Sequence, residues 1–121
     1  MNIEEYRNFC VSKLGVTEEF PFNETALVFK VMGKMFALIN VDSFEVISLK
    51  CDPEKGAELR EEYSGINYAY HFNKKHWIGV ATDGSVPEQL MYNLIDYSYE
   101  LVVSKLSKKL KEQLTRGKNL R

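Results

Sequence analysis

The chain has 121 residues, of which 45% are hydrophobic and 27% charged, with three prolines and seven glycines. This composition is typical of one globular domain and excludes the disordered, collagen-like and disulfide-stapled classes. No apolar run approaches the roughly 18 residues needed to span a bilayer, and the first residues lack the pattern of a signal peptide. We therefore expect a cytoplasmic protein without membrane contact.

The formal net charge of −1 conceals two oppositely charged parts. Residues 1–104 contain nine Lys and Arg against sixteen Asp and Glu, whereas residues 105–121 contain seven against one. A basic tail is attracted to polyanions, but cations are also favoured at the C-terminal end of a helix, and we prefer this second interpretation. We place one domain at residues 1–115 and a basic C-terminal tail at 116–121.

Local signals predict the first elements. Asn2 and Glu5 form a capping-box pattern, which predicts a helix over residues 3–14. The segment 16–24 has little periodicity and predicts a loop whose Phe20 and Phe22 pack against the core.

Three strands are expected between residues 26 and 50, joined by two-residue turns at Met32-Gly33 and Asp42-Ser43. These turns set Phe29 opposite Phe36 and Leu38 opposite Ile47. The predicted core face contains Leu27, Phe29, Val31, Phe36, Leu38, Ile47 and Leu49. The predicted opposite face contains Ala26, Val28, Lys30, Met35, Ala37, Ile39, Val46, Ser48 and Lys50. On that face, Lys30, Met35 and Lys50 form a row across three strands.

The second half of the chain begins with Asp52-Pro53, a helix-start signal for a helix over residues 53–63. Strands are expected at 68–72 and 76–82, joined by a tight turn within 73–75. Ser85 and Glu88 form a second capping-box pattern, which starts a final helix over 86–113. The order α-β-β-β-α-β-β-α predicts a single α+β domain with an antiparallel sheet packed on helices.

Motifs of common catalytic chemistry are missing from the sequence. No Gly-rich phosphate loop is present, and no spacing brings Cys10 or Cys51 beside His71 or His76. Both cysteines are interpreted as small buried apolar side chains. We therefore expect no enzyme activity, no catalytic residue, no metal site and no cofactor.

The densest functional candidate is the segment 70–77, which surrounds a predicted hairpin tip with lysines, histidines and an amide. An ordinary exposed hairpin has a similar composition and is the favoured interpretation from composition alone. The lone tryptophan, Trp77, is predicted to be buried as the anchor of this hairpin.

Four stretches in order, residues 27–38, 47–53, 71–78 and 98–102, resemble the MmcQ/YjbR family, and Phe20-Pro21-Phe22 looks like the loop of that family. The resemblance covers about residues 3–110. It implies a CyaY-like, or frataxin-like, fold and a DNA-binding role of the "double wing" type, in which hairpins act as wings. Positions that recur in the family match Lys34, Lys50, Asn73, Lys74, His76 and Trp77.

The expected function is therefore binding of duplex DNA by a monomer, through contacts from cations to phosphates. The predicted DNA-binding residues are Lys30, Lys34, Lys50, His71, Asn73, Lys74, Lys75 and His76. The alternative is a pocket for a small anionic ligand, or a surface for a partner protein, on the same face. Iron handling by acidic helices would follow from fold analogy alone. A continuous strip of lysines favours DNA, and a closed pocket around two of them favours a small anion.

Overall fold

The computed structural model describes residues 1–69 and 72–119. The strands in these ranges are β1 (Val16–Glu19), β2 (Ala26–Val31), β3 (Lys34–Asn40), β4 (Val46–Lys50), β5 (Ile66–Tyr68) and β6 (Trp77–Ala81). The helices in these ranges are α1 (Ile3–Val11), α2 (Pro53–Glu62), α3 (Glu88–Ser104) and α4 (Lys108–Asn119). The strands form one antiparallel sheet in the order β1-β2-β3-β4-β6-β5, so the chain is a single α+β domain, as predicted.

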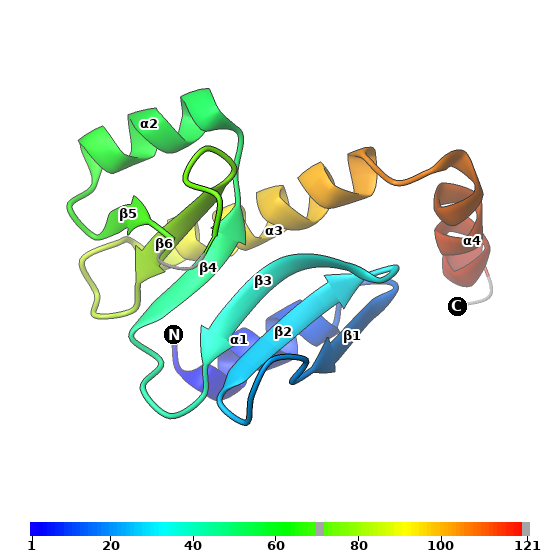
Figure 1. Ribbon diagram of the computed structural model, residues 1–121, viewed down its shortest axis with the longest axis horizontal. Coiled ribbons are helices and arrows are strands. Elements are labelled where there is room, and N and C mark those ends of the chain that lie inside the picture. The colour runs from blue at the N-terminus through cyan, green and yellow to red at the C-terminus, as the bar shows by residue number, and fades with distance from the viewer. Residues whose placement is uncertain (70–71, 120–121) are drawn as a thin grey trace.

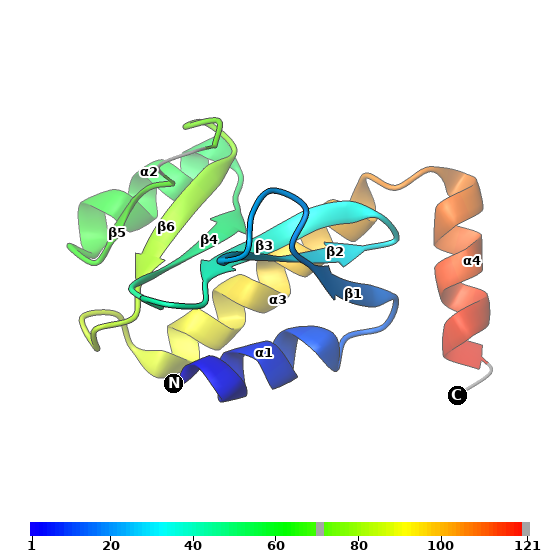
Figure 2. The same ribbon diagram turned by 60° about the horizontal axis from the view of Figure 1, so that its bottom comes forward.

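Helices α1 and α3 lie side by side against one face of the sheet, α2 lies beside β5 and β6, and α4 stands beyond the end of α3 (Figures 1 and 2). Residues with fully buried side chains, such as Phe29, Ile47 and Ile95, form the core between the sheet and the helices. No helix in the described ranges covers the other face, over which the loop between β1 and β2 arches (Figure 2).

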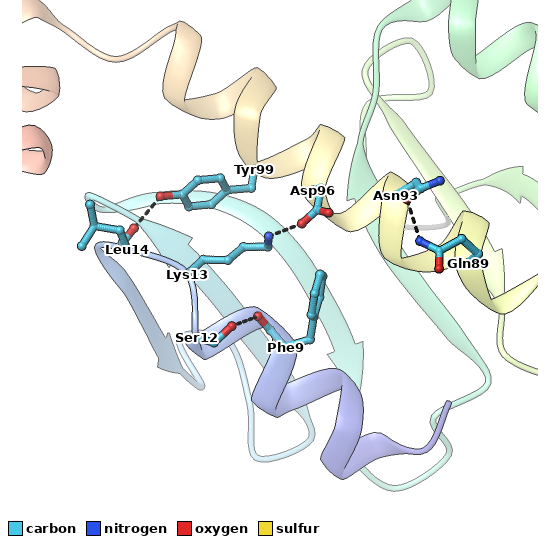
Figure 3. Close-up of polar contacts among 8 residues, drawn as sticks. All are labelled: Phe9, Ser12, Lys13, Leu14, Gln89, Asn93, Asp96 and Tyr99. Carbon is cyan, nitrogen blue, oxygen red and sulfur yellow. Dashed lines mark hydrogen bonds and ion pairs between the residues drawn. The ribbon is translucent and has the colours of Figure 1, made fainter. Parts of the chain in front are cut away.

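Polar contacts at the C-terminal end of α1 connect this helix to α3 (Figure 3). The Lys13 ammonium forms an ion pair with the Asp96 carboxylate, and the Tyr99 hydroxyl donates a hydrogen bond of 2.6 Å to the Leu14 carbonyl. At the other end of α1 the predicted capping box is confirmed, since the Asn2 side chain accepts from the Glu5 amide at 2.8 Å. These contacts fix α1 beneath the sheet.

The pairing of β2 with β3 differs from the predicted register after its first two residue pairs. Lys30 faces Met35 as expected, but a β-bulge follows, so that Phe29 faces Ala37 and not Phe36. A bulge leaves one residue of a strand without an opposite partner, and the next side chains therefore change face. Ala37, predicted on the opposite face, is consequently buried in the core beside Phe36.

The pairing of β3 with β4 carries a second shift of one residue. Leu38 faces Ser48 instead of Ile47, because the residues 41–45 join these strands in place of a two-residue turn. Leu38 therefore lies on the open face and its predicted burial in the core was wrong, whereas Ile39 faces Ile47 in the core. The two register shifts cancel, so the side chains of β4 lie on the predicted faces of the sheet. The other predicted core residues are buried as expected: Leu27, Phe29, Val31, Phe36, Ile47 and Leu49.

The segment predicted as a loop before β2 contains the additional edge strand β1, which pairs with β2. Its following loop does not pack against the core, because Phe20 is 49% exposed and Phe22 is 63% exposed. The Asn23 side chain instead closes this loop locally by accepting from the amides of Thr25 at 2.9 Å and Ala26 at 2.8 Å. The predicted placement of both phenylalanines was therefore wrong.

The predicted final helix is divided into α3 and α4. The Lys105 amide donates to the carbonyls of Val102 and Val103, which tightens the last turn of α3, and the Ser107 hydroxyl then accepts from the Leu110 amide at 3.2 Å. Ser107 thus starts a new helix. The predicted capping box at Ser85 was wrong, since its hydroxyl donates to the Asp83 carboxylate and Pro87 is the N-cap of α3. No helix of the described chain is long and apolar enough to cross a membrane.

Candidate functional site

A cavity of about 440 Å³ opens where the β2–β3 turn, the end of β4, the start of β6 and the last turn of α3 meet. We call this cavity the basic pocket, because three of its lining residues are lysines, namely Lys34, Lys50 and Lys105. The remaining lining residues are Gly33 and the apolar side chains of Met35, Trp77, Leu101, Val102 and Leu106. Cations and apolar surface therefore share one cavity.

The tight turn between β2 and β3 places Lys34 at the mouth of the basic pocket. Met32 has φ 49° and Gly33 has φ 83°, so both turn residues adopt the left-handed conformation that a two-residue hairpin turn requires. Val31 and Lys34 face each other across this turn, as the sequence predicted. The Lys34 side chain is exposed to solvent.

The end of β4 contributes Lys50, which is less exposed than Lys34, to the basic pocket. Its backbone amide donates to the Ser98 hydroxyl at 2.9 Å, and that hydroxyl donates to the Phe36 carbonyl at 2.6 Å. A buried side chain of α3 thus bridges β3 and β4 at the bulge, where the direct pairing of the two strands has not yet begun. This bridge holds the strand that carries Lys50.

The Lys50 ammonium is partly desolvated. Its side chain is half-buried. Two effects lower the pKa of Lys50, of which desolvation is the larger and repulsion from the Lys105 ammonium the smaller. Lys105 caps the C-terminal end of α3, where the helix dipole favours a cation. Within the described residues, no carboxylate lines the basic pocket and none of its three lysines forms an ion pair.

Trp77 forms a rigid wall of the basic pocket. The side chain is 6% exposed, which confirms its predicted burial, and its ring stacks on Phe72 with centroids 4.1 Å apart and planes inclined by 16°. The Lys50 ammonium lies 5.7 Å from the centroid of the indole ring, within the range of a cation–π interaction. Trp77 is therefore a buried side chain that also lines the cavity.

Lys30 does not contribute to the basic pocket. Its ammonium forms an ion pair with Glu19, which the unpredicted strand β1 brings beside β2. Lys30 faces Met35 as predicted, but the ladder of β3 with β4 begins only at Ala37 and Leu49. The predicted row of Lys30, Met35 and Lys50 across three strands was therefore wrong.

The remaining predicted site residues lie on the connection between β5 and β6. This connection is longer than the predicted tight turn, because β5 ends at Tyr68 and β6 begins at Trp77. Asn73 stabilises it by accepting from the Lys75 amide at 2.8 Å, and the His76 carbonyl accepts from the amide of Cys51, just before α2, at 2.9 Å. Lys74 and Lys75 are exposed. His71 lies outside the described residues.

A second cavity, of about 510 Å³, lies on the open face of the sheet. Its lining includes the exposed Phe22, Leu38 on β3 and Phe72, and no Lys, Arg, Asp or Glu side chain of the described residues belongs to it. Because Phe72 stacks on Trp77, this ring pair lies between the apolar cavity and the basic pocket.

The two cysteines are buried, as predicted. Burial raises the pKa of Cys10 to about 12 and that of Cys51 to about 11, so both thiols are protonated at neutral pH. Over residues 1–69 and 72–119, no group of three or more His, Cys, Asp or Glu side chains is arranged to hold a metal ion.

Several residues of the basic pocket were not foreseen from the sequence. Lys105 lies in the basic C-terminal part of the sequence, and Leu101 lies four residues before it. This spacing indicates one face of a helix, but nothing local indicates that this face reaches the end of β4. Lys34 and Lys50 were predicted as site residues, and the structure brings these two together.

These features define a small α+β protein with an antiparallel sheet, helices on one face and a basic pocket at one end. Residues 11–101 match the YjbR family model, and the chain belongs to this family. The resemblance found in the sequence motifs is thereby confirmed. Among curated relatives, Uncharacterized protein YjbR of Escherichia coli K12 is 33% identical over 115 residues, covering 94% of this chain and 98% of the relative. Uncharacterized protein YbdF of Escherichia coli O157:H7 is 37% identical over 99 residues, 81% of each chain.

Solved structures agree with this assignment. The crystal structure of Deinococcus radiodurans protein DR2400, which contains a DUF419 domain, superposes with a TM-score of 0.88 and 39% identity, covering 94% of this chain and 88% of that chain. A Pseudomonas syringae protein superposes with a TM-score of 0.71 and 31% identity, covering 84% of this chain and 98% of that chain. The fold is therefore that of the family.

Proposed function

We propose that this YjbR family protein is a non-enzymatic binding protein that holds an organic anion in the basic pocket. The observation that carries this proposal is the half-buried Lys50 ammonium, which has no carboxylate partner among the described residues and lies close enough to Lys105 to be repelled by it. A buried charge is costly unless it is paired. A bound anion supplies the missing partner, and Lys34 at the mouth adds a third positive charge.

The apolar lining supports an organic ligand over a simple ion. Leu101, Val102 and Leu106 present hydrocarbon beside the lysines, and Trp77 adds an aromatic wall. The volume of about 440 Å³ falls in the range of about 300–1,000 Å³ that is common for small-molecule sites. A ligand with an anionic group and an apolar body matches both parts of this surface.

The test is a binding titration with a panel of aromatic carboxylates, sulfate esters and phosphate esters. Replacement of Lys50 by Met keeps an unbranched apolar stem and removes the charge, so it is expected to weaken binding at least about tenfold. Calorimetry and the fluorescence of Trp77, the single tryptophan, report binding independently. The matched control is Lys30→Met, because Lys30 is paired with Glu19 outside the pocket. This variant should bind the anions with the affinity of the wild type. Failure of the whole panel to bind the wild type at millimolar concentration would reject the proposal.

Duplex DNA is the second candidate ligand, and cations outside the basic pocket favour it. Lys74 and Lys75 are exposed on the β5–β6 connection, next to the predicted contacts Asn73 and His76. Helix α4 adds further exposed cations beyond Lys105, among them Lys108, Lys109, Lys111 and Arg116. Such groups bind phosphates without reading the base sequence. The acidic body keeps the expected affinity modest.

Exchange of both Lys74 and Lys75 for Ala is expected to weaken binding equally for all duplex sequences. Each lost phosphate contact should lower the slope of log affinity against log salt by about one, so the double variant loses about one to two. Fluorescence polarisation with labelled duplexes over a salt series measures this slope. A variant in which glutamine replaces Lys108, Lys109, Lys111 and Arg116 separates the contribution of α4 from that of the β5–β6 connection. If only that variant loses binding, α4 is the contact. If the wild type binds no duplex at low salt, duplex DNA is rejected as a ligand.

A further inference from the structure

We infer that the basic pocket recognises the dianionic phosphate of a phosphomonoester that carries an apolar body. This inference rests on the proposed function of the pocket as an anion site and specifies the chemical class of the ligand. It follows from the number of charges, the type of cationic side chain and the apolar lining.

The number of charges favours a dianion. Lys34, Lys50 and Lys105 line one cavity in which no described carboxylate offsets them. A carboxylate or a sulfate ester carries one negative charge and leaves most of this positive charge uncompensated. A phosphomonoester carries close to two negative charges at neutral pH. Its second charge therefore relieves the repulsion between Lys50 and Lys105, which a monoanion relieves only in part.

The type of cation favours a tetrahedral group. The lysines come from three separate elements, namely the β2–β3 turn, the end of β4 and the C-cap of α3, and none of the arginines that the structure describes lines the cavity. Guanidinium groups bind carboxylates and phosphates with two parallel hydrogen bonds, whereas an ammonium acts as a point charge whose rotatable donors do not require a planar partner. Three ammonium groups that approach from different elements suit the three terminal oxygens of a phosphate.

The apolar lining favours an ester over inorganic phosphate. Met35, Leu101 and Leu106 have no polar group to offer, and burial of hydrocarbon against them and against Trp77 adds affinity that a free phosphate ion lacks. This chemistry can come from two sources. One is a small phosphorylated molecule, and the other is the 5′-terminal phosphate of a nucleic-acid strand, where the sugar and base provide the body.

The experiment compares phenyl phosphate, phenyl sulfate, benzoate and inorganic phosphate, measured by calorimetry and by Trp77 fluorescence. We expect phenyl phosphate to bind at least about tenfold more tightly than each of the other three. Lys105→Met should reduce the preference for phenyl phosphate over phenyl sulfate to less than about threefold. The variant lacks the positive charge that the second negative charge of the phosphate would offset. Lys105 is exposed at a helix end, so this variant is expected to fold, and its melting temperature checks that it does. Lys30→Met should keep the full preference.

The outcomes separate this inference from the proposed function. Equal binding of phenyl sulfate, benzoate and phenyl phosphate, with dependence on Lys50, would overturn the phosphomonoester inference and leave the anion site intact. Absence of binding by all four would overturn both. Short single strands with a 5′-phosphate or a 5′-hydroxyl then distinguish the sources. Binding of the 5′-phosphate strand at least about tenfold tighter than phenyl phosphate, without binding of the 5′-hydroxyl strand, assigns the ligand to nucleic-acid ends. Equal or weaker binding assigns it to a small molecule.

Discussion

Replacement of Trp77 by alanine is expected to lower the free energy of unfolding by about 3–5 kcal/mol, the range typical of a large aromatic side chain removed from a core. The indole is 6% exposed and stacks on Phe72, so its loss leaves a cavity and one unsupported ring. It also removes a wall of the basic pocket and the cation–π contact with Lys50. Guanidinium denaturation followed by far-UV circular dichroism measures the loss of stability, since the variant has no tryptophan to report by fluorescence.

The control for this prediction is Trp77→Phe. A phenyl ring preserves most of the stacking on Phe72 and fills part of the volume, so the expected cost is about 1–2 kcal/mol. Anion binding should also be retained more fully in this variant than in Trp77→Ala. A loss below about 1 kcal/mol for the alanine variant would show that Trp77 is not a core residue.

Replacement of Ser98 by alanine is expected to cost about 2–4 kcal/mol of stability. The hydroxyl is fully buried and satisfies two backbone groups at once, the Lys50 amide at 2.9 Å and the Phe36 carbonyl at 2.6 Å. Each buried group left without a partner costs about 1–3 kcal/mol. The same change frees the end of β4, so anion affinity should fall although Ser98 does not line the basic pocket. Urea denaturation and the binding titration measure the two effects.

A matched substitution exists on the same helix. Ser104 also donates its hydroxyl to a backbone carbonyl, that of Leu101, but its side chain is exposed and water can replace the bond. Ser104→Ala is therefore expected to change stability by less than about 0.5 kcal/mol. Equal effects of the two substitutions would show that the bridge between β3 and β4 has no special role in stability.

The starts of α1 and α2 could be predicted, because the hydrogen-bonding partners of their caps are close in the sequence. The caps at Asn2 and Asp52 bond to amides two or three residues away, and both were found where their patterns predicted them. The Met32-Gly33 turn follows from the ease with which glycine adopts a positive φ. In contrast, the capping-box pattern at Ser85 gave a wrong prediction, because the nearby Asp83 carboxylate accepts the hydrogen bond of the Ser85 hydroxyl.

Only part of the candidate site could be predicted. Lys34 and Lys50 lie at the ends of strands whose course is set by apolar alternation and turns, and the family motifs contain both residues. Lys105 and Leu106 enter the basic pocket because of the direction in which α3 crosses the sheet. That direction depends on the packing of the whole helix, and no short segment encodes it.

The sequence by itself determined the α+β class, the order of most elements, the burial of Trp77 and the family. Only the tertiary structure decided the register of the central strands. The bulge beside Phe36 is held by Ser98, which lies 62 residues further along the chain, and a shift of one residue reverses which side chains face the core. Tertiary packing likewise pairs Lys30 with Glu19 and leaves Lys50 without a carboxylate in the described chain. Charge counts cannot anticipate this difference, because the free energy of a charge depends on its partners and on its burial in the folded chain.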